Sequence, residues 1–169
     1  MGGKLQTTST NTLHATATEG SHGGTEVGPP QGEDLAARVV AVTADGLVDR
    51  MTPGAGGLAA LLDVLIRVQA PVRAVRSDGV LVDRRDFHQR ASVAWPEGVH
   101  VNPVCVATAV GPGCGRPDLL AEGTRALEAA CLAVSGQEAD GDRLTWILPE
   151  GCAAEAERVL HAALVGRAP

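Results

Sequence analysis

The sequence has very few aromatic residues: no tyrosine, one phenylalanine and two tryptophans among 169 residues. Proteins that bind single-stranded nucleic acid without sequence preference stack the bases on aromatic side chains, so this scarcity argues against that function. The formal net charge is −6, whereas a protein that binds the phosphate backbone needs a basic surface. We therefore expect no nucleic-acid partner.

The first 34 residues also lack an apolar pattern. They are rich in glycine, threonine and serine and end in Gly-Pro-Pro-Gln-Gly-Glu. Such a segment cannot bury enough surface to offset its ordering entropy, so we interpret residues 1–34 as a disordered tail. It holds no apolar run long enough for a signal peptide or a membrane helix, and we expect no membrane partner.

Paired cysteine motifs are absent. The four cysteines are Cys105, Cys114, Cys131 and Cys152. They show no Cys-x-x-Cys spacing and no cluster typical of structural zinc, so no metal ligand is predicted. Their apolar surroundings favour buried thiols in a reducing, cytoplasmic compartment. Cys114 differs because it lies in a glycine-rich loop before a helix start, where a thiolate can be stabilised.

The sequence shows no catalytic constellation. The five histidines are scattered along the chain, at His14, His22, His88, His100 and His161. No Ser-His-Asp order and no pair of sheltered carboxylates accompanies them. We therefore predict no catalytic residues and no cofactor. A small α+β enzyme stays as the less favoured alternative to a binding module.

The remaining residues alternate between strand-like and helix-like patterns. Helices are predicted where leucine, valine or alanine recur at helical spacing, at residues 58–66, 119–130 and 156–164. Strands are predicted at residues 38–43, 46–51, 72–75, 79–82, 91–95, 103–110, 131–135 and 144–148. Asp45-Gly46 between the first two strands indicates a hairpin turn.

A weak internal repeat organises these elements. Residues 90–98 resemble residues 143–151, and both copies end in Pro-Glu-Gly. A loop, a helix and strands precede each copy, which indicates a duplicated α+β module at residues 35–102 and 103–169. The second unit reads βαββα, whereas the first reads βαββ and lacks a closing helix. This order favours antiparallel sheets with helices on one face.

The second unit carries a family resemblance. Residues 104–113 look like a strand ending in a Gly-x-Gly loop, residues 119–130 like the helix that follows, and Ser135-Gly136-Gln137-Glu138 like a Ser-Thr-Ser-Glu turn. These features resemble the pair of ACT domains in the regulatory part of aspartate kinases, over about residues 38–165. The resemblance implies two ferredoxin-like units of βαββαβ type in tandem. No kinase domain accompanies them in this sequence.

The resemblance implies a free-standing regulatory module. Its ligand would be a small amino acid, lysine or threonine among the candidates, and its partner a second copy or a separate kinase subunit. A degenerate module that keeps the sheet and dimer contacts without a ligand is the alternative. The family's polar contact after each helix is replaced by Val72-Arg73 and by Cys131-Leu132.

Two glycine-rich loops are the candidate ligand site, because each opens a helix and offers backbone N–H groups to a carboxylate. From these loops we predict ligand contacts at Thr52, Pro53, Gly54, Gly56, Gly57, Gly111, Gly113 and Asp118. By resemblance to the family's turn, Ser135, Gln137 and Glu138 complete the set, and Asp49 is a further candidate for the amino group. The ligand is expected between the two units, capped by both loops. The plain alternative is that glycine and proline only make the turns.

Overall fold

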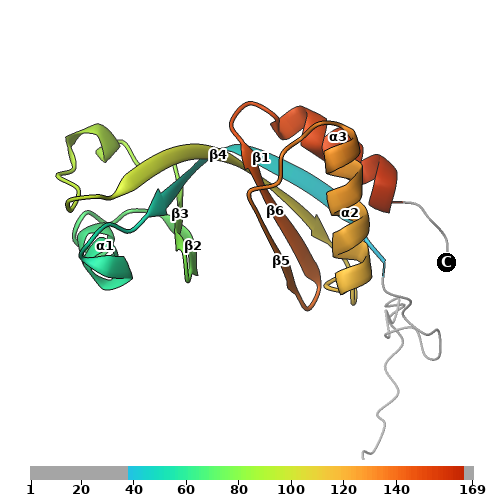
Figure 1. The fold of residues 1–169 in the computed structure, drawn as a ribbon, viewed down its shortest axis with the longest axis horizontal. Coiled ribbons are helices and arrows are strands. Elements are labelled where there is room, and N and C mark those ends of the chain that lie inside the picture. Colours follow the sequence, from blue (N-terminus) through green and yellow to red (C-terminus); the bar gives the residue numbers. More distant parts are fainter. Residues whose placement is uncertain (1–37, 166–169) are drawn as a thin grey trace, which may run out of the picture. The chain divides into compact units, whose positions relative to one another are not determined.

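The computed structural model describes residues 38–165, which form an antiparallel sheet and three α-helices (Figure 1). The predicted tail, residues 1–34, lies outside the described residues. In chain order the elements are β1 (Ala41–Thr52), α1 (Gly57–Arg67), β2 (Val72–Arg76), β3 (Gly79–Asp83), β4 (His100–Val110), α2 (Pro117–Ala129), β5 (Gly136–Asp140), β6 (Arg143–Pro149) and α3 (Ala153–Leu164). The predicted α+β class is confirmed.

The six described strands belong to one sheet in the order β2-β3-β1-β4-β6-β5. A unit of βαββαβ type places its fourth strand beside its first. In this sheet β4 lies beside β1, so each half uses the other half's long first strand as its fourth strand. The predicted boundary between residues 102 and 103 falls inside β4, and the division into residues 35–102 and 103–169 stays a prediction.

The three helices pack against the same face of the sheet. Side chains alternate between the faces of a strand, so Val101 and Cys105 of β4 share one face. Cys105 packs in the core beneath α2 and α3, together with Trp146. Val101 pairs with Met51 of β1, which packs against α1. The helices therefore cover one face, as the sequence predicts.

The opposite face carries a cluster made of strand residues alone. Its buried members are Val48, Leu81, Val104 and Ile147. They come from β1, β3, β4 and β6, which are neighbours in the sheet. This cluster joins the two halves on the side without helices.

The predicted hairpin at residues 38–51 is wrong. β1 is one strand that pairs with β4 on both sides of a bulge between Asp45 and Val48. The Asp45 carboxylate accepts the Leu47 N–H at 2.9 Å, which stabilises the bulge locally. The Asp-Gly pair therefore marks a bulge, another structure in which turn-forming residues occur.

The two copies of the sequence repeat do not share a structure. The second copy forms β6, but the first contains a 3₁₀ turn at Arg90–Ser92 where a strand was predicted. Trp95 contacts Phe87 edge to face, with ring centroids 6.1 Å apart. The structural equivalent of β6 is β3, because both are the second of two strands after a helix.

The helix predictions hold with small changes. In α1, Leu61 and Leu65 are buried, but Ile66, predicted on the same face, is 74% exposed. In α2, Gly123 packs directly against Trp146, since a Cβ there would lie 2.4 Å from the indole ring. The strand predicted at residues 131–135 forms instead at β5, after Cys131 adopts a φ of 59°.

Candidate functional site

The two predicted ligand loops lie at opposite ends of the β1–β4 ladder. Thr52, before the first loop, pairs with His100, and Val110, before the second loop, pairs with Ala41. At about 3.3 Å per residue, the 12 residues of β1 separate the loops by on the order of 30 Å. The expectation that both loops of one chain cap one ligand is therefore wrong.

The second loop, residues 111–116, has its backbone donors occupied by the chain itself. The Gly111 N–H donates to the Asp142 carbonyl at 3.0 Å, and the Gly115 N–H to the Gly141 carbonyl at 2.7 Å. The Gly113 N–H donates to the Asp142 carboxylate at 2.5 Å. A carboxylate ligand would have to displace these contacts.

The helix that follows this loop also carries its own anion. Asp118 lies in the first turn of α2 and accepts bonds from Arg116 at 2.9 and 2.7 Å. The Arg116 guanidinium, with a smaller contribution from the N–H groups of Asp118 and Leu119, lowers the pKa of Asp118, and desolvation opposes this shift. The positive end of α2 is therefore already paired with a carboxylate.

The first loop, residues 53–56, differs from the second in the helix that follows it. α1 begins after Gly56 with no side-chain cap, and its first turn contains no acidic residue. The Gly57 N–H donates to the Gly54 carbonyl at 2.9 Å. Helix N-termini leave several N–H groups without intrahelical partners and attract anions. Among the three α-helices of residues 38–165, α1 is the one with neither a capping side chain nor an acid in its first turn.

Some of the predicted glycines also have structural reasons. A Cβ at Gly54 would lie 2.0 Å from the Glu97 carbonyl oxygen, and one at Gly111 would lie 2.0 Å from the Arg38 carbonyl oxygen. Gly57 and Gly113 have φ values of 71° and 61°, which glycine adopts readily. The turn-making interpretation therefore accounts for these four glycines whether or not a ligand binds.

The turn at residues 135–138 does not bring its side chains together. The Ser135 hydroxyl donates to the Ile147 carbonyl at 3.1 Å. Gln137 contacts the Thr124 hydroxyl of α2 at 2.6 Å. Glu138 pairs with Arg76 of β2 at 2.8 Å. Adjacent strand residues point to opposite faces, so these side chains do not form one polar cluster.

Asp49 is fully buried and does not extend into a ligand loop. Its carboxylate lies 2.5 Å from the Arg90 guanidinium and 3.8 Å from that of Arg84. Desolvation raises the pKa of Asp49 despite these two cations. The Arg84 side chain also pairs with Glu150 at 2.7 Å. Asp49 therefore belongs to an internal ionic cluster.

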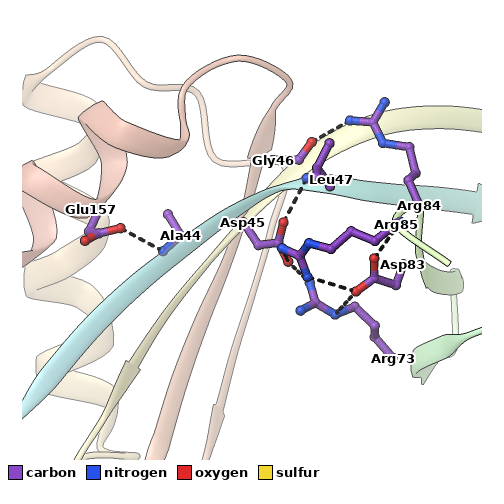
Figure 2. A network of polar contacts seen from close by, with 9 residues as sticks. All are labelled: Ala44, Asp45, Gly46, Leu47, Arg73, Asp83, Arg84, Arg85 and Glu157. Atoms are coloured by element: carbon purple, nitrogen blue, oxygen red, sulfur yellow. Dashed lines mark hydrogen bonds and ion pairs between the residues drawn. The ribbon is translucent and has the colours of Figure 1, made fainter.

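A second ionic network surrounds the bulge of β1 (Figure 2). Asp45 lies 2.7 Å from Arg73 and 2.6 Å from Arg85, and Asp83 contacts the same two arginines at 3.6 and 3.2 Å. Desolvation opposes ionisation of Asp45, but the Leu47 N–H, Arg85 and Arg73 together lower its pKa. No local sequence pattern predicts this network, and the charge-rich run at residues 83–86 is its one visible signal in the sequence.

Cavities open onto the described residues at two places that bear on the predicted site. One, of about 400 Å³, lies on the face without helices, and the other, of about 550 Å³, lies beside Phe87 and Trp95. Of the eleven predicted ligand residues, Glu138 lines the first, and the other ten line neither of the two. The loops thus offer backbone atoms to a ligand, and the first cavity offers side chains.

The thiols follow the sequence analysis in part. Cys105 and Cys114 are buried, whereas Cys131 is exposed. Desolvation raises the pKa of Cys105 to about 12 and also raises that of Cys114, so burial favours the neutral thiol at Cys114. Within residues 38–165, no group of three or more His, Cys, Asp or Glu side chains is arranged to hold a metal ion. The helices in this part of the chain are too short or too polar to cross a membrane.

No protein-family model and no curated protein matches the sequence. Solved structures do match. The ligand-free regulatory subunit of aspartate kinase from Thermus thermophilus is 20% identical, with a TM-score of 0.59, over 75% of this chain and 97% of that chain. The regulatory subunit from Thermus flavus is 19% identical, with a TM-score of 0.57, over 75% and 98%.

A whole enzyme matches over a smaller share of its length. The aspartate kinase from Synechocystis is 18% identical, with a TM-score of 0.59, over 81% of this chain but 29% of that chain. The predicted resemblance is confirmed at the level of structure, and it extends to regulatory subunits and not to a kinase domain. The described residues have the fold of the aspartate kinase regulatory subunit, with its paired ACT-like units.

Proposed function

We propose that the chain is a regulatory module that binds a small amino acid and thereby modulates a partner enzyme. The observation that carries the proposal is the free N-terminus of α1, in a fold shared with regulatory subunits of aspartate kinase. The α-carboxylate would be held by the N–H groups at the start of α1, beside Thr52, Pro53, Gly54, Gly56 and Gly57. The second loop is less suitable, because Asp118 and Asp142 already satisfy it.

The first experiment is calorimetry of the full chain with a panel of amino acids that includes lysine and threonine. A binding heat and a raised melting temperature for at least one member support the proposal. If no member of the panel gives either signal, the sensing function is wrong, and the chain is a structural module that has lost its ligand.

The binding place is tested by giving α1 the anion that it lacks. Ala59 is exposed and lies in the first turn of α1, so Ala59→Glu places a carboxylate near the free N–H groups. We expect this variant to weaken amino-acid binding by about tenfold or more, equivalent to about 1.4 kcal/mol or more. Ala59→Gln is the matched control, because it adds a side chain of similar size without charge and should bind as the original protein does. Equal affinity in all three proteins would place the ligand elsewhere.

The partner is proposed to be a second copy of the chain or a separate kinase subunit. One matching structure is of aspartokinase α and β subunits, which combine in that protein. In this chain, β2 is an edge strand, and it exposes Val72 and Val75 at 41% and 53%. Exposed edge strands favour pairing with another chain. Sedimentation at micromolar concentration should show a species above 17.2 kDa, and Val75→Arg should shift it toward the monomer.

A further inference from the structure

The cavity on the face without helices is lined by donors that the fold leaves in excess. Its floor is the sheet itself, and Thr43, Thr108 and Thr145 line it at adjacent positions. Thr43 of β1 pairs with Thr108 of β4, and Thr108 pairs with Thr145 of β6. Three hydroxyl groups therefore form a row across the three strands. Among residues 38–165, no hydrogen bond engages any of these hydroxyls.

Arginine side chains surround this row. Four guanidinium groups line the cavity, those of Arg73, Arg76, Arg85 and Arg143, against two carboxylates, those of Asp45 and Glu138. Asp78, Asp83 and Asp140, outside the lining, also pair with these arginines, so the excess of the lining is one of N–H donors and not of net charge. Each guanidinium has five N–H donors, so one or two ion pairs leave donors unused. The lining is rich in donors and poor in acceptors.

Arg143 is the arginine that is held most weakly. Within residues 38–165 its one ion pair, with Asp140, spans 3.6 Å, and both side chains are more than half exposed. Such exposed pairs contribute little to stability. The Arg143 guanidinium can therefore turn from Asp140 to a bound anion at small cost.

The cavity also lies between the two edges of the sheet. Arg76 of the edge strand β2 reaches Glu138 of the other edge strand β5 at 2.8 Å, although four strands lie between them in the sheet order. A molecule bound at the threonine row would therefore contact side chains from both halves of the chain.

We propose that this cavity binds a small organic anion that carries two or more carboxylate or phosphate groups. The threonine hydroxyls and the spare arginine N–H groups donate to its oxygen atoms, and Arg143 supplies the pairing charge. A volume of about 400 Å³ is in the range of small-ligand sites. This site is distinct from the proposed amino-acid site at α1, because it lies on the opposite face of the sheet and uses side chains instead of loop amides.

The test measures binding to the full chain with citrate and with inorganic phosphate, by calorimetry and by thermal melting against chloride at equal ionic strength. Citrate represents the carboxylate source and phosphate the phosphoryl source, so the stronger response identifies the group. Binding and a raised melting temperature with either anion, beyond the chloride effect, are expected. No response beyond that of chloride with either anion would overturn the proposal.

Two variants test the residues. Arg143→Gln should weaken binding about tenfold, and Thr108→Val, which removes a hydroxyl but keeps the side-chain shape, should weaken it severalfold. Arg158→Gln is the matched control, because Arg158 also forms an exposed i,i+3 pair, with Glu155, but lies on α3. Equal weakening by Arg158→Gln would show unspecific charge attraction and reject the site.

Two further variants separate folding and the amino-acid site from the anion site. Arg143→Lys keeps the charge and should retain part of the affinity, and the melting temperature without anion shows whether each variant is folded. Ala59→Glu should leave anion binding unchanged, so this proposal and the proposed amino-acid function can fail independently. Loss of anion binding in Ala59→Glu would contradict a separate site.

Discussion

The two strand-to-helix loops occupy equivalent places in the two halves of the fold, yet they differ in what their donors contact. In the second loop, Asp142 accepts from Gly111 and Gly113, and Asp118 pairs with Arg116 at the start of α2. In the first, α1 starts without a capping side chain or an acid. A glycine-rich loop before a helix is therefore a candidate anion site only where the rest of the fold leaves its backbone N–H donors free.

The largest expected effect is on stability, and it concerns the close backbone packing at a glycine that both loops share. Gly54→Ala and Gly111→Ala should each lower the free energy of unfolding by about 2–4 kcal/mol, because each new Cβ would overlap a backbone carbonyl oxygen. Gly46→Ala is the control, since its Cβ would meet Ala153 at an ordinary 3.7 Å. Chemical denaturation measures all three. A tolerated Gly54→Ala would show that the first loop is not held against residues 97–98, and the two loops would then differ in packing as well.

A smaller effect is expected where the loops differ. Asp142→Ala removes the carboxylate that accepts the Gly113 N–H, and should cost about 1–2 kcal/mol of unfolding free energy. Asp142→Asn keeps an acceptor oxygen and should cost less. Denaturation of the two variants side by side measures the difference. Equal stability of Asp142→Ala and the original protein would mean that the second loop does not depend on this contact and is as open as the first.

The smallest effect is the charge at the start of α2, and it depends on pH. The folded-state pKa of Asp118 lies below its ordinary value of 3.8, so the ionised carboxylate stabilises the fold above that pH. This contribution is lost as the pH falls through the lowered pKa. Asp118→Asn should therefore melt slightly below the original protein at neutral pH, and the gap should close in acid. If the difference in melting temperature between the two proteins stays constant from pH 7 to pH 2, the charge of Asp118 does not cause it.

Gly113→Val is not an informative test of ligand binding at the second loop. Gly113 has a φ of 61°, and a β-branched residue there would be strained whether or not a ligand binds. Ala59→Glu is the better test, because it changes the charge at α1 at an exposed helical position.

The local elements could be predicted from the sequence because each has its own signal. Leucines at helical spacing define α1, and Pro117 followed by Asp118 marks the start of α2. Short ambiguous segments could not be assigned in the same way. Residues 91–95 have strand-like alternation but form an irregular segment whose Trp95 packs on Phe87. Asp45-Gly46 has the composition of a turn, and continued pairing with β4 makes it a bulge instead.

The sequence by itself also determined the two glycine loops and the duplicated order of strands and helices. Only the tertiary structure decided that β1 and β4 lie side by side in one sheet, which separates the loops by the length of β1. The tertiary structure also decided which loop has its backbone N–H groups hydrogen-bonded within the chain. The acceptor for the Gly113 N–H is the Asp142 carboxylate, 29 residues further along the chain. The threonine row joins strands from both halves of the fold, and the ionic network joins β1 to β2 and to residues 83–85. Local patterns reveal where backbone donors are exposed, whereas contacts between distant residues determine whether those donors stay free.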